Sequence, residues 1–187
     1  MRQSAMLKIL AISLLVLICI SFILAYFWGK EPAAFNIEEV SKVEAQNLNR
    51  PVVIGTATTA TLIHLLETML EKPGGYLSND VTLPSVMMDD IPSWEYGVLT
   101  QARDLSRAMR DNMSRSQSQS SEDKDLTLAE SRFNIDHKSW ALPDAQTEYK
   151  DGIKHLRKYL SRLSDTNTQD AQFYARADNL SVWLAVV

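Results

Sequence analysis

The chain has 187 residues, of which 45% are hydrophobic, and its 19 basic and 23 acidic side chains give a net charge of -4. This charge excludes a strongly basic nucleic-acid-binding protein, and the single cysteine excludes a disulfide-stabilised scaffold. One long apolar run and a polar remainder predict one membrane crossing and one modest water-soluble domain.

The first element is the run from Ile9 to Trp28, which is uncharged and almost wholly apolar. Because a helix rises about 1.5 Å per residue, a run of this length reaches about 30 Å, the thickness of the hydrocarbon core of a bilayer. The sequence therefore predicts a transmembrane helix that contacts the lipid bilayer through residues 9–28.

The charges that flank this run predict its orientation. Arg2 and Lys8 precede it, whereas Lys30 on the other side is offset by acidic residues, so the positive-inside rule predicts that residues 1–8 are cytoplasmic. The bulk of the chain is then exported. A cleaved signal peptide is the alternative, but the length of the run and the aromatic residues at its end favour an uncleaved signal anchor.

The residues after the span are expected to divide into a stalk and a domain. Residues 29–51 have few large apolar side chains and predict a semi-ordered stalk, in which Asn36 and Glu39 have the spacing of a capping box for a short helix. Pro51 breaks any helix at the end of the stalk. We expect residues 52–187 to form an all-α exported domain.

Three segments of this domain have the apolar spacing of amphipathic helices. Their spaced residues are Leu62, Leu66 and Met69; Trp94, Val98, Ala102, Leu105 and Met109, after Ser93 as N-cap; and Tyr149, Ile153, Leu156, Leu160 and Leu163, after Asp144 as N-cap. Prolines and polar residues predict a loop at 76–92. A serine-rich stretch that ends in an acidic run predicts a solvated loop at 114–125.

A fourth segment repeats the spacing of the third. Its apolar residues are Phe173, Ala177, Leu180, Leu184 and Val187. Because only residues 164–168 separate the two segments, we predict that they form an antiparallel helical hairpin with coiled-coil-like packing. The last helix has no C-terminal stop signal, so we expect the protein to continue beyond residue 187.

The histidines do not have the spacing of a metal site. His64, His137 and His155 lack an HxxxH or HExxH partner. His64 shares a predicted helix face with Glu67 and Glu71, which favours a solvated surface over metal binding. We therefore expect no metal and no cofactor.

Three acidic residues near Trp94 form a first candidate site. Asp89, Asp90 and Glu95 surround the start of the predicted helix and could act as an acid/base pair in glycan cleavage. The alternative is structural, because the helix dipole stabilises carboxylates at a helix N-terminus.

Three arginines form a second candidate site. Arg103, Arg107 and Arg110 project together from the side of their helix opposite its apolar residues. Such a face can bind phosphate, an anionic lipid headgroup or an acidic partner. A solvated surface is the alternative, because Asp104 and Asp111 lie about one turn from Arg107 and dilute the charge.

Three blocks of the sequence resemble one known family. They are KPGGYLSNDV from Lys72, PSWEYGVLTQARDLSRAMRDNMSRSQSQSSEDKDL from Pro92 and DAQFYARADNL from Asp170. They are similar to an uncharacterised family of bacterial, mainly proteobacterial, inner-membrane proteins (domain of unknown function 2333). This resemblance implies one inner-membrane anchor and a helical periplasmic domain, and it supplies no catalytic or binding residue.

The favoured hypothesis is an inner-membrane-anchored, all-α periplasmic protein that binds or scaffolds an envelope protein partner. The alternative is a membrane-anchored envelope hydrolase that uses the acidic residues near Trp94. No nucleic-acid partner is expected, because the chain carries no strongly basic region.

Overall fold

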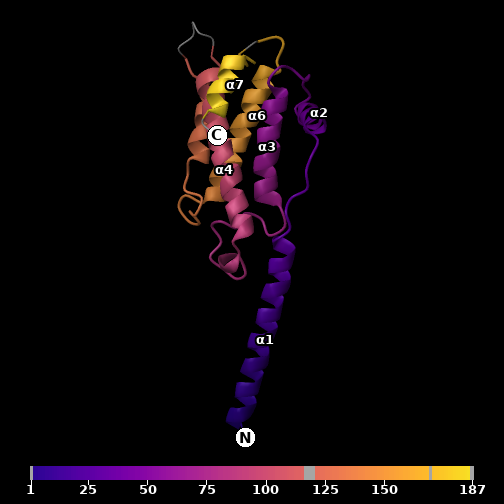
Figure 1. The fold of residues 1–187 in the computed structure, drawn as a ribbon, viewed down its shortest axis with the longest axis vertical. Helices are drawn as coiled ribbons and strands as arrows, with labels where there is room; N and C mark the ends of the chain where they lie inside the picture. Colours follow the sequence, from indigo (N-terminus) through magenta and orange to yellow (C-terminus); the bar gives the residue numbers. More distant parts are fainter. Residues whose placement is uncertain (1, 116–120, 169, 186–187) are drawn as a thin grey trace.

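A computed structural model describes residues 2–115, 121–168 and 170–185, and every regular element among them is a helix (Figure 1). The longer helices are α1 (Arg2–Trp28), α2 (Ile37–Asn47), α3 (Thr56–Glu71), α4 (Asp90–Ala108), α5 (Lys124–Phe133), α6 (Ala145–Leu163) and α7 (Ala177–Leu184). A 3-10 turn, η1 (Ser85–Met87), precedes α4, and a π turn, η2 (Met109–Met113), extends it. The predicted all-α fold is confirmed.

The first helix stands apart from the others. Figure 1 shows α1 projecting as a rod from one end of the molecule. Residues Ala5–Trp28 are long and apolar enough to cross a membrane, and their most apolar part is 0% buried in the structure. A signal sequence has the same features, so the helix by itself shows only that a membrane-spanning length is present.

Helices α3, α4, α5 and α6 form an up-and-down four-helix bundle, in which each helix packs against the next and α6 packs against α3. Helices that follow one another in the sequence are also neighbours in space, as is usual for this topology. Residues of all four helices are 0% exposed in one shared core, among them Leu66, Leu99, Leu126 and Leu156. We call the end of the bundle from which α1 projects the α1 end, and the opposite end the far end.

The first three predicted helices are present as α3, α4 and α6. Asp144 caps α6 as predicted, because its carboxylate accepts a hydrogen bond from the Thr147 amide at 3.0 Å. The start of α4 differs from the prediction. This helix begins at Asp90 rather than after Ser93, since proline is tolerated in a first helical turn and Pro92 does not delay it.

The prediction that residues 145–163 form a hairpin with residues 173–187 is wrong. Helix α6 pairs with α5, and α7 packs against α4. Phe173 precedes the start of α7. Residues near the start of α7 are tied to the end of η2, because the Tyr174 amide donates to the Met113 carbonyl at 2.7 Å.

Helix α5 begins inside the region expected to be a solvated loop. Asp123 caps this helix through the amides of Asp125 and Leu126. Asp125 is buried, and it receives a hydrogen bond from Arg162 of α6 at 2.7 Å and lies 3.0 Å from Nδ1 of His155. The acidic run is therefore a helix start held by α6. Residues 116–120 of the serine-rich stretch lie outside the described residues.

The segment expected to be a semi-ordered stalk contains α2, which packs against α3. Asn36 caps α2, as its spacing indicated, by accepting from the Glu38 amide at 2.9 Å. Glu44 of α2 is buried and accepts from Arg157 of α6 at 2.7 Å, and the same guanidinium bonds Glu67 of α3. Paired charges thus join α2 to the bundle.

Gly152 of α6 and Gly97 of α4 should respond oppositely to alanine. A Cβ on Gly152 would lie 2.5 Å from the ring of Phe133, whereas no atom lies within 4 Å of a Cβ on Gly97. Because Phe133 is 0% exposed, its ring has no room to move. Gly152→Ala should destabilise the protein by about 1–3 kcal/mol, and Gly97→Ala should stabilise it by up to about 1 kcal/mol.

Urea unfolding of the full chain in a mild detergent, followed by circular dichroism, measures both changes. A stabilising Gly152→Ala would contradict the close approach of α5 and α6.

The contacts of Asp125 predict a dependence of stability on pH. Burial opposes ionisation, but hydrogen bonds from His155 and Arg162 outweigh it and lower the pKa of Asp125 from its ordinary 3.8. A lowered folded-state pKa stabilises the protein above the unfolded value, and this contribution is lost as the pH falls through the folded value. Asp125→Asn should therefore cost about 1–3 kcal/mol at neutral pH.

The difference in the free energy of unfolding between Asp125→Asn and the unmodified protein should become smaller below a pH of about 4. Thermal unfolding across this range measures the effect, with Asp170→Asn as an exposed control. If the stability difference between Asp125→Asn and the unmodified protein stays constant in acid, the ionised Asp125 carboxylate does not stabilise the fold.

Candidate functional site

The three arginines proposed as an anion-binding face lie along α4 and η2, where they contact α5. Arg103 donates to the carbonyls of Phe133 and Ile135, at 2.6 and 2.8 Å, and so caps the end of α5. Arg107 and Arg110 both bond Glu130, a buried carboxylate. All three side chains thus have partners inside the protein. Anion binding stays a prediction that no contact here tests.

The acidic residues proposed as an acid/base pair lie in different environments. Asp89 and Asp90 are exposed, whereas Glu95 is 0% exposed. The Glu95 carboxylate bonds the ammonium of Lys72 and accepts from the amides of Leu77 and Ser78 at 2.8 and 2.7 Å. These contacts give Glu95 a structural role, because both of its oxygens are occupied by protein donors.

The three histidines lie apart, each against a different neighbour. His64 packs edge-to-face against Phe35 with ring centroids 4.4 Å apart, and the ring centroids of His137 and Tyr96 are 4.7 Å apart. Burial lowers the pKa of His137 below its ordinary 6.5. Within residues 2–115, 121–168 and 170–185, no group of three or more His, Cys, Asp or Glu side chains is arranged to hold a metal ion.

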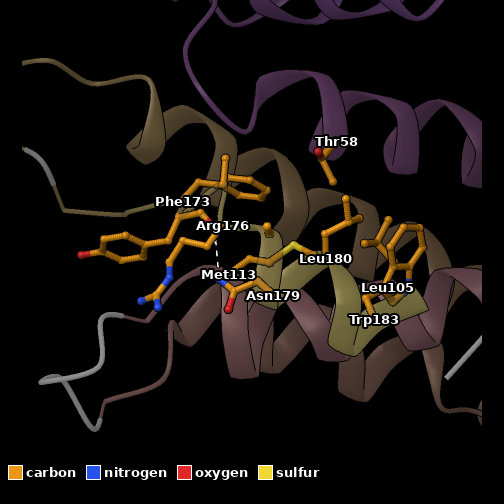
Figure 2. Close-up of a pocket in the computed structure, with 11 residues that line it drawn as sticks. Thr58, Leu105, Met113, Phe173, Arg176, Asn179, Leu180 and Trp183 are labelled. Carbon is orange, nitrogen blue, oxygen red and sulfur yellow. Dashed lines mark hydrogen bonds between the residues drawn. The ribbon is translucent and has the colours of Figure 1, made fainter. Parts of the chain in front are cut away.

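An apolar groove that the sequence did not indicate lies between α3, α4 and α7 (Figure 2). Its volume is about 390 Å³. It is lined by Thr58, Leu105, Met113, Phe173, Tyr174, Ala175, Arg176, Ala177, Asn179, Leu180 and Trp183. Figure 2 shows Phe173 and Arg176 at one end and Leu105 and Trp183 at the other. This volume is within the range of clefts that bind ligands, and most of the lining side chains are apolar.

Hydrogen bonds to main-chain carbonyls hold the segments on one side of this groove together. Met113 ends the π turn η2, a kind of turn that is frequent at functional sites. Asn179 of α7 donates to the carbonyls of Asn112 and Tyr174, at 2.9 and 3.1 Å. The side-chain amide therefore holds α7 and the segment before it against the end of η2.

Helix α7 also presents apolar side chains to solvent. Leu180, Val182 and Leu184 are 48%, 53% and 58% exposed. The indole Nε1 of Trp183 is buried and has no acceptor in the described part of the chain. An unpaired buried donor costs about 1–3 kcal/mol, so a partner that supplies an acceptor would bind more favourably.

The apolar periodicity of residues 173–187 predicts a helix with one buried face and a hairpin seam, but not a groove. Leu180 does line the groove, but Met113 and Thr58 come from distant segments. Their meeting depends on the docking of α7 onto α4, which the local pattern does not encode.

The buried Lys72–Glu95 pair yields a prediction about stability. Lys72 and Glu95 side chains are 2% and 0% exposed, so removing the carboxylate leaves an unpaired charge inside the protein. Glu95→Ala should lower the free energy of unfolding by about 3–5 kcal/mol. Asp90→Ala, an exposed residue in the first turn of the same helix, should change it by about 1 kcal/mol or less, because that carboxylate interacts with the helix dipole.

Urea unfolding of both full-length variants measures these values. Equal, small effects would show that the Glu95 carboxylate does not hold the fold together at this point.

The comparisons with known proteins give one match. The model of a family described as uncharacterized protein conserved in bacteria (DUF2333) matches residues 1–187. Comparisons with curated proteins and with solved structures find no match. This agrees with the resemblance carried by the three sequence blocks, and it extends over the whole of the sequence. The chain therefore belongs to the DUF2333 family of uncharacterized proteins conserved in bacteria.

Proposed function

We propose that this is a bitopic inner-membrane protein whose periplasmic helical domain binds a protein partner of the cell envelope. The N-terminus is cytoplasmic in this proposal, and α1 is an uncleaved anchor. The apolar groove and the exposed Leu180 and Leu184, which share one face of α7, carry the proposal, because a soluble domain seldom exposes neighbouring large apolar side chains without a partner.

The position of this surface favours a protein partner over the lipid bilayer. The groove is lined by the N-terminal part of α3 and by the end of η2, which lie toward the far end of the bundle (Figure 1). The 16 residues of α3 correspond to about 24 Å of helix. In this proposal the bilayer lies at the α1 end of the bundle. The length of α3 therefore separates the groove from the membrane, and lipids do not contact α7.

The chemistry of the groove defines the partner's contact. Apolar side chains line most of it, and Arg176 and Asn179 add polar groups. A short apolar segment, such as one face of an amphipathic helix, matches this combination. No contact in the described residues favours the hydrolase alternative, since Glu95 is occupied by Lys72 and Ser78.

Photocrosslinking in living cells tests this proposal. With p-benzoylphenylalanine in place of Leu180, which lines the groove, we expect one discrete adduct with a second protein. The same group at Leu128 of α5, which is 42% exposed, should give none. Leu184→Asp should reduce the adduct by about tenfold, because burying an unpaired charge in an apolar contact is costly.

Three outcomes would contradict the proposal. Equal labelling at positions 180 and 128 would show that α7 has no specific partner. An adduct of twice the chain mass would show that α7 binds a second copy of the chain. A Lys154→Cys variant in a Cys19→Ser background, with its cysteine at an exposed position of α6, should be labelled by a membrane-impermeant maleimide in cells with a permeabilised outer membrane; failure to label it would place the domain on the cytoplasmic side.

A further inference from the structure

The part of the loop between α3 and α4 that surrounds η1 turns Ser85 inward and four large apolar side chains outward. Val81, Leu83, Val86 and Met87 are 62%, 52%, 64% and 79% exposed. We call these four residues the apolar loop patch. In a water-soluble loop the opposite arrangement is expected, so the exposure of this patch requires an explanation.

Hydrogen bonds inside the loop hold this inverted arrangement. The Asp80 carboxylate accepts from the Thr82 amide at 2.9 Å, from the Thr82 hydroxyl at 2.8 Å and from the Ser85 hydroxyl at 2.7 Å. Ser85 is 3% exposed. Burial raises the pKa of Asp80, but the hydrogen bonds from Ser85 and Thr82 together outweigh it and lower the pKa from its ordinary value. The loop is thus a built turn that displays its apolar side chains.

The loop lies beside the end of the apolar helix. A Cβ on Gly29, the residue after α1, would lie 3.9 Å from Cε of Met88. Trp28 also packs closely on Gly74, because a Cβ added to Gly74 would lie 2.7 Å from the Trp28 ring. Figure 1 shows η1, which contains two residues of the patch, level with the last turn of α1.

The last residues of α1 mark the level of the membrane surface. Tyr26, Phe27 and Trp28 form the aromatic end of the span, and Nζ of Lys30 lies 5.4 Å from the Tyr26 ring and 5.1 Å from the Phe27 ring. Aromatic rings, and a lysine whose side chain extends along them toward the polar headgroups, are typical of the boundary between headgroups and acyl chains. The apolar loop patch lies at this same level.

A second exposed apolar pair lies in the other loop at this end of the bundle. Trp140 and Leu142 are 65% and 98% exposed in the loop between α5 and α6. This loop is joined to the first one, because Nδ2 of Asn79 donates to the Ser139 carbonyl at 2.9 Å. Tryptophan beside aliphatic side chains is again the composition of an interfacial contact.

We propose that the apolar loop patch inserts into the headgroup and acyl-chain boundary of the bilayer that α1 spans. The patch would then be a second, interfacial membrane contact that sets the orientation of the bundle relative to the bilayer. This inference rests on the proposed membrane anchoring by α1. It is independent of the partner proposed for α7.

Fluorescence quenching in phosphatidylcholine vesicles tests the insertion. The full chain carries Cys19→Ser and one new cysteine, Met87→Cys, labelled with an environment-sensitive fluorophore. Lipids with a nitroxide near the headgroup should quench this label, and aqueous iodide should not. A label at Ile54→Cys, which is 70% exposed at the far end, should show the reverse.

A label in the span separates the two proposals. Val16→Cys should be quenched by lipids with a nitroxide deep in the acyl chain. If Val16 is quenched and Met87 behaves like Ile54, the loop does not insert and this inference is overturned while the anchor stands. If Val16 is not quenched, the anchoring proposal fails, and the inference falls with it.

A charged variant checks that insertion depends on the apolar side chains. With the label at Leu83→Cys, the double substitution Val86→Asp and Met87→Asp should reduce lipid quenching to the level seen at Ile54. An unchanged circular dichroism spectrum shows that the bundle remains folded. Quenching that survives both aspartates would overturn the apolar contact as its cause.

Discussion

A single buried carboxylate joins the bundle to the end of α1. Glu95 of α4 bonds Lys72, which follows α3, and also the amides of Leu77 and Ser78 in the connecting loop. The Lys72 ammonium bonds the Gly75 carbonyl as well. Since Trp28 packs on Gly74, the turn held by this ion pair is also the surface on which α1 rests.

The helices of the bundle are joined by further charges that come from distant parts of the chain. Arg110 and Arg107 bond Glu130, Arg162 bonds Asp123 and Asp125, and Arg157 bonds Glu44 and Glu67. The carboxylates of Glu44, Asp125 and Glu130 are buried, so loss of the arginine that pairs with each would leave a buried charge without its partner. These pairs also specify which helices are neighbours. The charged residues that seemed available for binding or catalysis are largely used in this way.

The two ends of the bundle differ in their exposed apolar surfaces. At the α1 end, a turn stabilised by Asp80 displays the apolar loop patch beside Trp28 and Gly29. The second surface belongs to α7, whose exposed residues lie next to a groove over η2. Their positions suit two different occupants, a bilayer at the first end and a protein at the second.

The sequence alone determined the features that depend on local pattern. The apolar run of α1, the stripes of α3, α4 and α6 and the caps at Asn36 and Asp144 were all predicted, because each rests on residues within a few positions of one another. Helix α5 was missed, because the serine-rich and acidic residues before it resemble a solvated loop.

Only the tertiary structure decided which helix covers which face. The partner of α6 is α5 and not residues 173–187, and Glu130 is 20 positions from the arginine that it binds in η2. The periodicity of a helix shows that a face will be buried, but not against what, since several apolar stripes fit one another equally well. Glu95 lies 23 positions from Lys72, and chain folding alone brought them together.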